Sequence, residues 1–168
     1  MYPRFYKNIL SFDRFQSLQD DLGQWTLTAS TTPSGENAFW GISENKHIAN
    51  VYMAASYVSL RIRDVVGGRP VLFRYRCNGA TTNQAGSTFH DDALQDNFVS
   101  FVYYTSPHWN TQWGGETVIL DDKGEYQYSP YIPNGGVLFP SRWQHYGASP
   151  NSHCPEFRTS IGFIFEIC

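Results

Sequence analysis

A histidine and a carboxylate stand two positions apart in the segment Phe89-His90-Asp91-Asp92. In extended backbone, side chains at positions i and i+2 point to the same face, so His90 and Asp92 can bind one metal ion together. Asp91 points to the other face and is expected to lie outward. A metal centre built on this pair needs a third protein ligand from elsewhere in the chain.

Three histidines downstream of the motif are candidates for the third ligand: His108, His145 and His153. His108 lies in a proline-flanked loop directly after the strand that leaves the motif, and His153 lies in a polar loop expected at the surface. His145 follows the apolar residues 137–139 and is expected near the end of a late strand. Strands distant in sequence become neighbours in a jelly roll, so His145 is the predicted ligand.

Two imidazoles and one carboxylate on one face of a metal ion form the facial triad of non-haem Fe(II) oxygenases. Three positions stay open, two for a bidentate co-substrate and one for dioxygen. A 2-oxo acid in that role needs a fixed cation for its far carboxylate. Arg158 opens the last strand and can hold a carboxylate through two nitrogens. Ser160, two residues later on the same face, offers a hydroxyl.

Two helices are expected before the metal motif. The first spans residues 12–22, with Ser11 as its cap and Gly23 as its stop. The second, over residues 46–66, has apolar residues at alternating steps of three and four and is followed by glycines. His47, near its start, is interpreted as a surface residue.

Strands are expected at 2–10, 25–28, 71–77, 87–92, 98–105, 116–120, 125–132, 137–139, 143–147 and 158–167. The region between the 25–28 segment and Asn45 is expected to be irregular. Residues 78–86 are expected to form a polar loop. Short strands at intervals of about ten residues indicate an antiparallel sandwich or barrel. We therefore expect a mainly β fold with flanking helices, a double-stranded β-helix (jelly roll) whose helices cover one outer sheet.

The chain of 168 residues is expected to form a single domain, residues 1–168, in which 1–70 support a jelly-roll core of 71–168. Its net charge of −3 gives no general attraction to nucleic acid or to an anionic membrane. A local basic run is interpreted as solvated arginines, with an acidic-substrate patch as the alternative. This run consists of Arg61, Arg63, Arg69, Arg74 and Arg76.

The three cysteines, Cys77, Cys154 and Cys168, are too far apart for a thiolate zinc site and do not suggest a disulfide framework. No apolar run reaches membrane-spanning length, and residues 1–4 do not open a signal peptide. We expect a soluble protein of a reducing, cytoplasm-like compartment.

The order His90-x-Asp92, His145 and Arg158 resembles the Fe(II)- and 2-oxoglutarate-dependent dioxygenases, and most closely their prolyl 4-hydroxylase-like branch. Three further segments carry the resemblance: Val102-Tyr103-Tyr104, Pro107-His108-Trp109 and Trp113-Gly114-Gly115-Glu116-Thr117. It covers about residues 71–168, whereas the first 70 residues match only as generic helical support.

The resemblance implies Fe(II) as cofactor, 2-oxoglutarate as co-substrate and dioxygen as oxidant, with release of succinate and CO2. It also implies that Tyr104 donates its hydroxyl to the distal carboxylate beside Arg158. Tyr103 and Tyr104 point to opposite faces of a strand, so only one of them enters the pocket, and the spacing to Trp109 favours Tyr104. Tyr75 remains an alternative for this contact.

The substrate is left open between a peptide or protein side chain and a small metabolite. Residues 78–88 match no substrate-reading segment of the family, so prolyl specificity is not implied. Two alternative functions are a jelly-roll module that binds carbohydrate through Trp109 and Trp113, and a cupin-type metalloenzyme that uses no 2-oxo acid. The oligomeric state is also left open.

Overall fold

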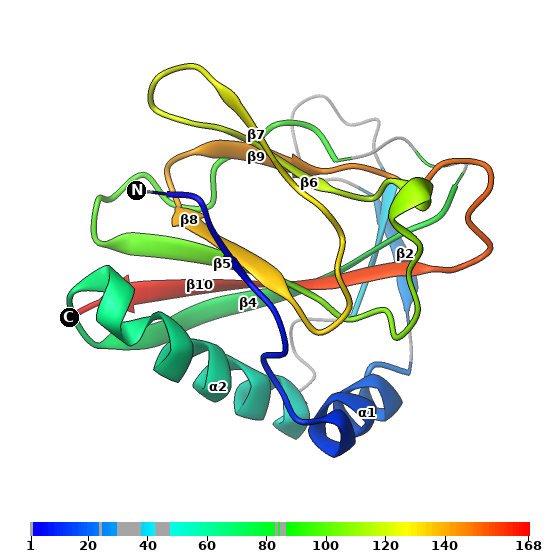
Figure 1. Cartoon of the computed structure of the whole chain (residues 1–168), viewed down its shortest axis with the longest axis horizontal. Coiled ribbons are helices and arrows are strands. Elements are labelled where there is room, and N and C mark those ends of the chain that lie inside the picture. The colour runs from blue at the N-terminus through cyan, green and yellow to red at the C-terminus, as the bar shows by residue number, and fades with distance from the viewer. Residues whose placement is uncertain (1, 24, 30–37, 43–47, 83, 85–86) are drawn as a thin grey trace.

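Two antiparallel sheets form the body of the protein in a computed structural model, which describes residues 2–23, 25–29, 38–42, 48–82, 84 and 87–168 (Figure 1). The major sheet has the strand order β1-β8-β5-β10-β4-β3-β2 and the minor sheet the order β7-β6-β9. The major strands are β1 (Arg4–Tyr6), β2 (Thr26–Ala29), β3 (Ala38–Gly41), β4 (Pro70–Ala80), β5 (Phe98–Tyr104), β8 (Gly136–Pro140) and β10 (Arg158–Ile167). The minor strands are β6 (Thr117–Leu120), β7 (Tyr126–Ser129) and β9 (Gln144–Gly147).

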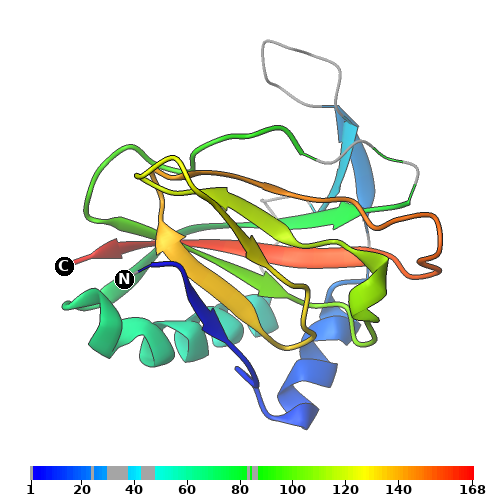
Figure 2. The same cartoon turned by 45° about the horizontal axis from the view of Figure 1, so that its top comes forward.

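The last strand, β10, lies between β4 and β5, and β5 in turn pairs with β8. Neighbours in the sheet are thus far apart in sequence, as a jelly roll requires. Both helices lie against one face of the major sheet, and the minor sheet lies on its other side (Figure 2). The predicted fold class, mainly β with flanking helices in a jelly roll, is confirmed.

The helices are α1 (Phe12–Asp21) and α2 (Ala49–Val66). Along α2 the predicted apolar stripe is buried, with Val51, Val58 and Ile62 wholly inaccessible to solvent. Gly67 ends the helix in the left-handed conformation that glycine adopts without strain. The expected start at residue 46, together with His47, lies outside the described residues. Within the described part of the chain, no helix is long and apolar enough to cross a membrane.

The polar segment expected to begin a loop at residue 78 belongs instead to β4, which continues to Ala80. Asn78 pairs with Ser160 of β10, and Gly79 pairs with Trp40 of β3. A Cβ at Gly79 would stand 2.3 Å from the Phe157 ring, so this glycine allows a close approach of another segment. The polar composition of this segment is typical of a loop. The strand pairing that overrides it cannot be seen locally, because the partner strands lie far away in the sequence.

Three other expectations differ from the structure. The region expected to be irregular contains the short strand β3, and the first strand covers only three of the residues 2–10. Residues 87–92 form no strand but contribute an isolated bridge at His90. Each of these segments is held by partners elsewhere in the chain, which a short window of sequence does not reveal.

Alternation along β5 and β10 divides the side chains between two environments. Phe101, Tyr103 and Phe163 face the helices and join their apolar core. Tyr104 and Ser160, which are paired across the two strands, point to the opposite face, toward the minor sheet. The space between the sheets therefore receives polar side chains, and it is here that the candidate site lies.

The buried stripe of α2 is testable by mutation. Ile62→Ala, which removes a wholly buried side chain, should lower the free energy of unfolding by about 2–5 kcal/mol. Leu60→Ala is the matched control, because Leu60 in the same helix is 68% exposed and should change stability by less than about 0.5 kcal/mol. Urea unfolding of both variants measures the difference. Equal effects would contradict the described packing of α2.

Candidate active site

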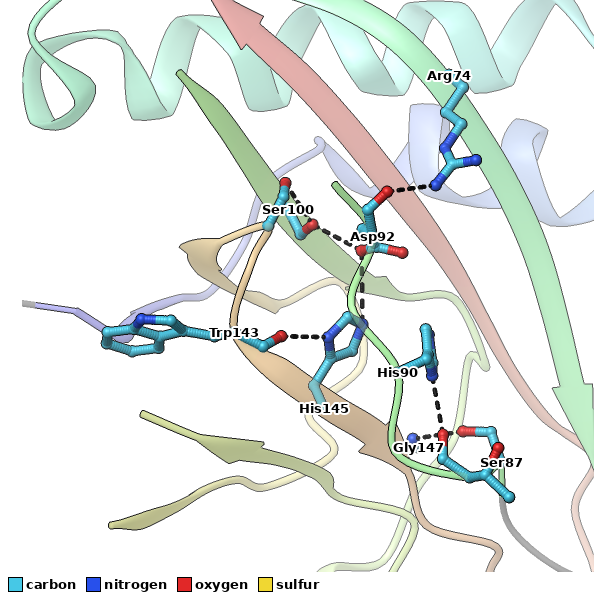
Figure 3. Close-up of polar contacts among 10 residues, drawn as sticks. Arg74, Ser87, His90, Asp92, Ser100, Trp143, His145 and Gly147 are labelled. Atoms are coloured by element: carbon cyan, nitrogen blue, oxygen red, sulfur yellow. Dashed lines mark hydrogen bonds and ion pairs between the residues drawn. The ribbon is translucent and has the colours of Figure 1, made fainter. Parts of the chain in front are cut away.

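The side chains of His90, Asp92 and His145 converge between the two sheets (Figure 3). Their candidate ligand atoms all lie within 4.8 Å of one another, and no other group of three or more His, Cys, Asp or Glu residues in the described chain does so. His145 is buried, Asp92 is half-buried and His90 is exposed. The group therefore has one side embedded in the protein and one side open.

The two histidines are brought together by their own main chain. His90 and His145 form an isolated antiparallel bridge, with N···O distances of 3.1 Å and 2.9 Å in the two directions. Their ring centroids are 4.4 Å apart. His145 belongs to β9, so the bridge attaches the segment of His90 to the edge of the minor sheet.

Each of the two imidazoles is oriented through its Nδ1 atom. Nδ1 of His90 lies 2.9 Å from the Thr88 carbonyl oxygen, and Nδ1 of His145 lies 3.1 Å from the Trp143 carbonyl oxygen. A carbonyl can only accept, so Nδ1 carries a proton and Nε2 is the ring atom that can bind a metal ion. Burial lowers the pKa of His145, against an opposing effect of Asp92, and so favours the neutral imidazole that metals bind.

Contacts from four different segments of the chain hold Asp92. Its carboxylate oxygen Oδ2 lies 3.5 Å from Nε2 of His145 and accepts a 2.6 Å hydrogen bond from the Ser100 hydroxyl. Its main-chain N–H donates to the Ser141 carbonyl oxygen at 2.9 Å. Its own carbonyl oxygen accepts from the Arg74 guanidinium at 2.6 Å.

The residues that sequence reasoning placed outside the centre remain outside it. Asp91, next to the ligand pair, is exposed, and so are His108 and His153. None of the three belongs to the converging group. His47 lies outside the described residues.

Arg158 is buried to 3% exposure on the same inner face. Its Nε donates to the Gly115 carbonyl oxygen at 2.8 Å, and Nη1 donates to the Ser160 hydroxyl at 3.2 Å. Its Nη2 has no hydrogen-bond partner within the protein. A buried, unpartnered guanidinium N–H carries a desolvation penalty that an anionic ligand relieves. The distal carboxylate of a 2-oxo acid fits this requirement.

The guanidinium lies close to an aromatic ring and to a glycine. Its Cζ atom is 5.3 Å from the centre of the Tyr131 ring, a cation–π contact. A Cβ at Gly147 would stand 3.3 Å from Nη2 and 3.4 Å from Nη1. Glycine at this position of β9 therefore leaves the planar group undisturbed.

The two tyrosines left open by the sequence lie on opposite faces of the major sheet. Tyr104, almost wholly buried, shares the inner face with Arg158, and burial raises the pKa of its hydroxyl, which stays protonated. That hydroxyl bonds to Thr117 Oγ1 at 3.0 Å and to Ser129 Oγ at 2.8 Å. Tyr75 packs in the helix-facing cluster, with its ring 5.5 Å from that of Tyr52 in α2.

Several residues of the site had no local signal in the sequence. Tyr131 arrives from the turn after β7, and its ring lies 4.5 Å from that of Tyr104 and 4.2 Å from that of Trp109. Trp109 and Trp113 are half-buried, and their rings meet edge to face with centroids 5.6 Å apart. The hydroxyls of Thr117, Ser129, Ser100 and Ser141 were also missed. Thr117, Ser129 and Ser100 differ from ordinary strand residues only in their inward position, and Ser141 lies in the turn after β8.

Comparison with known proteins agrees with this geometry. Residues 68–166 match the model of the 2OG-Fe(II) oxygenase superfamily, which is more than half of the chain. The chain therefore belongs to this superfamily, and the resemblance drawn from its motifs is confirmed. No curated protein matches the sequence.

Among solved structures, a Pseudomonas putida prolyl-4-hydroxylase is similar in fold, with a TM-score of 0.65 and 17% identity over 99% of this chain and 92% of that one. A Trichoplax adhaerens prolyl hydroxylase bound to a hypoxia-inducible factor peptide has a TM-score of 0.65 and 14% identity over 98% and 83%. The epimerase SnoN of nogalamycin biosynthesis, solved with Fe3+, alpha-ketoglutarate and nogalamycin RO, has a TM-score of 0.73 and 9% identity over 98% and 78%. Identities this low show a common fold.

The protein is accordingly a 2-oxoglutarate-dependent oxygenase that uses Fe(II), 2-oxoglutarate and dioxygen. The two alternatives, a carbohydrate-binding module and a cupin-type enzyme without a 2-oxo acid, gain no support from the family or from the structural neighbours.

The close approach of β9 to Arg158 gives a steric test. Gly147→Val should displace the guanidinium and weaken 2-oxoglutarate binding by roughly 10–100-fold, because overpacking of this kind costs about 1–3 kcal/mol. Gly147→Ala adds a smaller side chain and should have a smaller effect. Calorimetry of 2-oxoglutarate binding to the anaerobic Mn(II) protein measures both affinities, with thermal unfolding as the control for folding. An unchanged affinity in Gly147→Val would show that the guanidinium does not bind the co-substrate.

Proposed function

We propose that the protein is a hydroxylase in which His90, Asp92 and His145 bind Fe(II) and Arg158 binds 2-oxoglutarate. The observation that carries this proposal is the position of Arg158. A buried guanidinium with an unpartnered Nη2 faces the same space between the sheets as the His-Asp-His group. Neither feature alone requires a 2-oxo acid, but a metal chelator with a distal carboxylate accommodates both.

When bound, the iron would couple two reactions of the co-substrates, the reduction of dioxygen and the decarboxylation of 2-oxoglutarate to succinate and CO2, to hydroxylation of the substrate. The protein's part is to bind and orient. Main-chain carbonyls accept from the Nδ1 atoms of His90 and His145, which leaves their Nε2 atoms to bind the metal. Phe139 packs against the ring of His145 at 4.6 Å and keeps that side of the centre dry.

Tyr104 and Ser160 complete the proposed carboxylate site. They are cross-strand partners on the inner face, and Ser160 already accepts from Arg158. A protonated Tyr104 offers one donor, which in the structure is shared with the hydroxyls of Thr117 and Ser129. Reorienting this single proton toward a carboxylate leaves both neighbours able to donate to the phenol oxygen.

We further propose that the substrate is a peptide side chain or a small metabolite and that the chain acts as one catalytic domain. Structures of this fold include one solved with a peptide and one with a nogalamycin compound. The net charge of −3 disfavours nucleic acid as a substrate. The cysteines Cys77, Cys154 and Cys168 are free thiols, which supports a reducing location such as the cytoplasm.

Turnover of the co-substrate tests this function without knowledge of the substrate. The wild-type protein should convert 2-oxoglutarate to succinate in a reaction that requires both Fe(II) and dioxygen, and His145→Ala should abolish it. Arg158→Lys keeps the charge but loses the planar fork, and Arg158→Ala loses both. Since removal of one partner from a buried charge pair costs about 2–5 kcal/mol, Arg158→Ala should raise the KM for 2-oxoglutarate by more than roughly 30-fold.

Arg63→Ala is the matched control, because this arginine is exposed on α2 and should leave the KM unchanged. Succinate release is followed by chromatography at several 2-oxoglutarate concentrations. A KM in Arg158→Ala equal to that of the wild type would refute the proposed anchor.

A further inference from the structure

The carboxylate of Asp92 depends on side chains, because the segment that carries it has no strand of its own. Apart from the bridge at His90, residues 87–92 form no ladder. The main-chain N–H and carbonyl of Asp92 are held by the Ser141 carbonyl oxygen and by Arg74. Its carboxylate is held by Ser100, whose hydroxyl lies 2.6 Å from Oδ2 (Figure 3).

Ser100 is itself held by a second hydroxyl. The Oγ atoms of Ser100 and Ser141 are 2.8 Å apart, and the two residues are 1% and 0% exposed. An ionised carboxylate can only accept, so the Ser100 proton points to Asp92 and the Ser141 proton points to Ser100. The direction of the hydrogen-bond chain, from Ser141 through Ser100 to Asp92, follows from this constraint.

The apolar surroundings of Ser100 and Ser141 are unusual for a pair of hydroxyls with a purely structural role. Ser100 is central in β5, where its cross-strand partners on the inner face are Phe139 and Ile164. Burying two hydroxyls among apolar side chains is unfavourable unless both find partners. Here the two hydroxyls bond to one another, and that of Ser100 also bonds to the carboxylate of Asp92. Two apolar side chains would fill the same space without needing hydrogen-bond partners. We therefore attribute the two hydroxyls to the hydrogen-bond chain that ends at the Asp92 carboxylate.

We propose that Ser100, oriented by Ser141, is a positioning residue that fixes the Asp92 carboxylate for metal binding. This inference rests on the proposed function. A short charge-assisted hydrogen bond restricts rotation of the carboxylate before the metal arrives. It also occupies a lone pair of Oδ2, which disfavours chelation of one ion by both oxygens. Binding through one oxygen leaves the open positions that the co-substrate and dioxygen need.

Metal affinity in the absence of 2-oxoglutarate tests the inference directly. Ser100→Ala should weaken Mn(II) binding by roughly 10–100-fold, the usual effect of removing the partner of a metal ligand. Ser100→Thr retains the hydroxyl and a strand-compatible side chain and should restore most of the affinity. Ser141→Ala, which leaves the Ser100 hydroxyl in place, should have a smaller effect, and the double variant should lose less than the sum of the two single changes.

Ser59→Ala is the matched control for loss of a hydroxyl hydrogen bond, because Ser59 on α2 donates to the Pro70 carbonyl oxygen far from the centre. It should leave Mn(II) affinity unchanged. Calorimetry is carried out at a temperature at which circular dichroism shows every variant to be folded, so a stability effect does not imitate a loss of affinity.

The outcomes separate this inference from the function on which it rests. Wild-type affinity in Ser100→Ala, or no recovery in Ser100→Thr, would overturn the positioning role while leaving the metal site intact. Failure of the wild-type protein to bind Mn(II), or unchanged binding in His145→Ala, would overturn the proposed metal site itself and the positioning role with it.

Discussion

The main-chain bridge between His90 and His145 is the contact on which the candidate centre depends. Because each residue donates to and accepts from the other, the two imidazoles emerge side by side from segments far apart in sequence. The bridge attaches a segment that belongs to no strand to β9, whose Gly147 N–H also donates to the Ser87 hydroxyl. The minor sheet in turn rests over the inner face of the major one. Placement of Asp92 then needs only the few additional contacts from Ser100, Ser141 and Arg74.

Burial of Arg158 imposes a second constraint. A guanidinium at 3% exposure must satisfy its donors inside the protein, and the structure provides partners for Nε and Nη1 but none for Nη2. Tyr131 makes a cation–π contact with the planar group and Gly147 approaches it closely, so its orientation is restricted before any ligand binds. The Nη2 group, which has no partner, is thus held in a fixed direction. This is how a preorganised anion site differs from a surface arginine.

Residue spacing predicted the parts of this arrangement that are local. The i, i+2 rule selected Asp92 over Asp91, and the position of His145 after an apolar strand selected it over His108. In the structure, Asp92 and His145 lie together with His90. Tyr131 and the Ser100–Ser141 pair escaped prediction because their role arises from strand pairing between distant segments. The same cause hid the end of β4, where Gly79 is required by the ring of Phe157 and not by a turn.

Visible absorption of the anaerobic protein tests the joint iron and 2-oxoglutarate site most directly. Addition of Fe(II) and 2-oxoglutarate should produce a weak charge-transfer band that saturates at a single equivalent of iron and needs both components. His145→Ala should lose the band, whereas His108→Ala, which changes an exposed histidine outside the centre, should keep it. Absence of the band in well-folded wild-type protein, or its survival in His145→Ala, would contradict the assignment of this site.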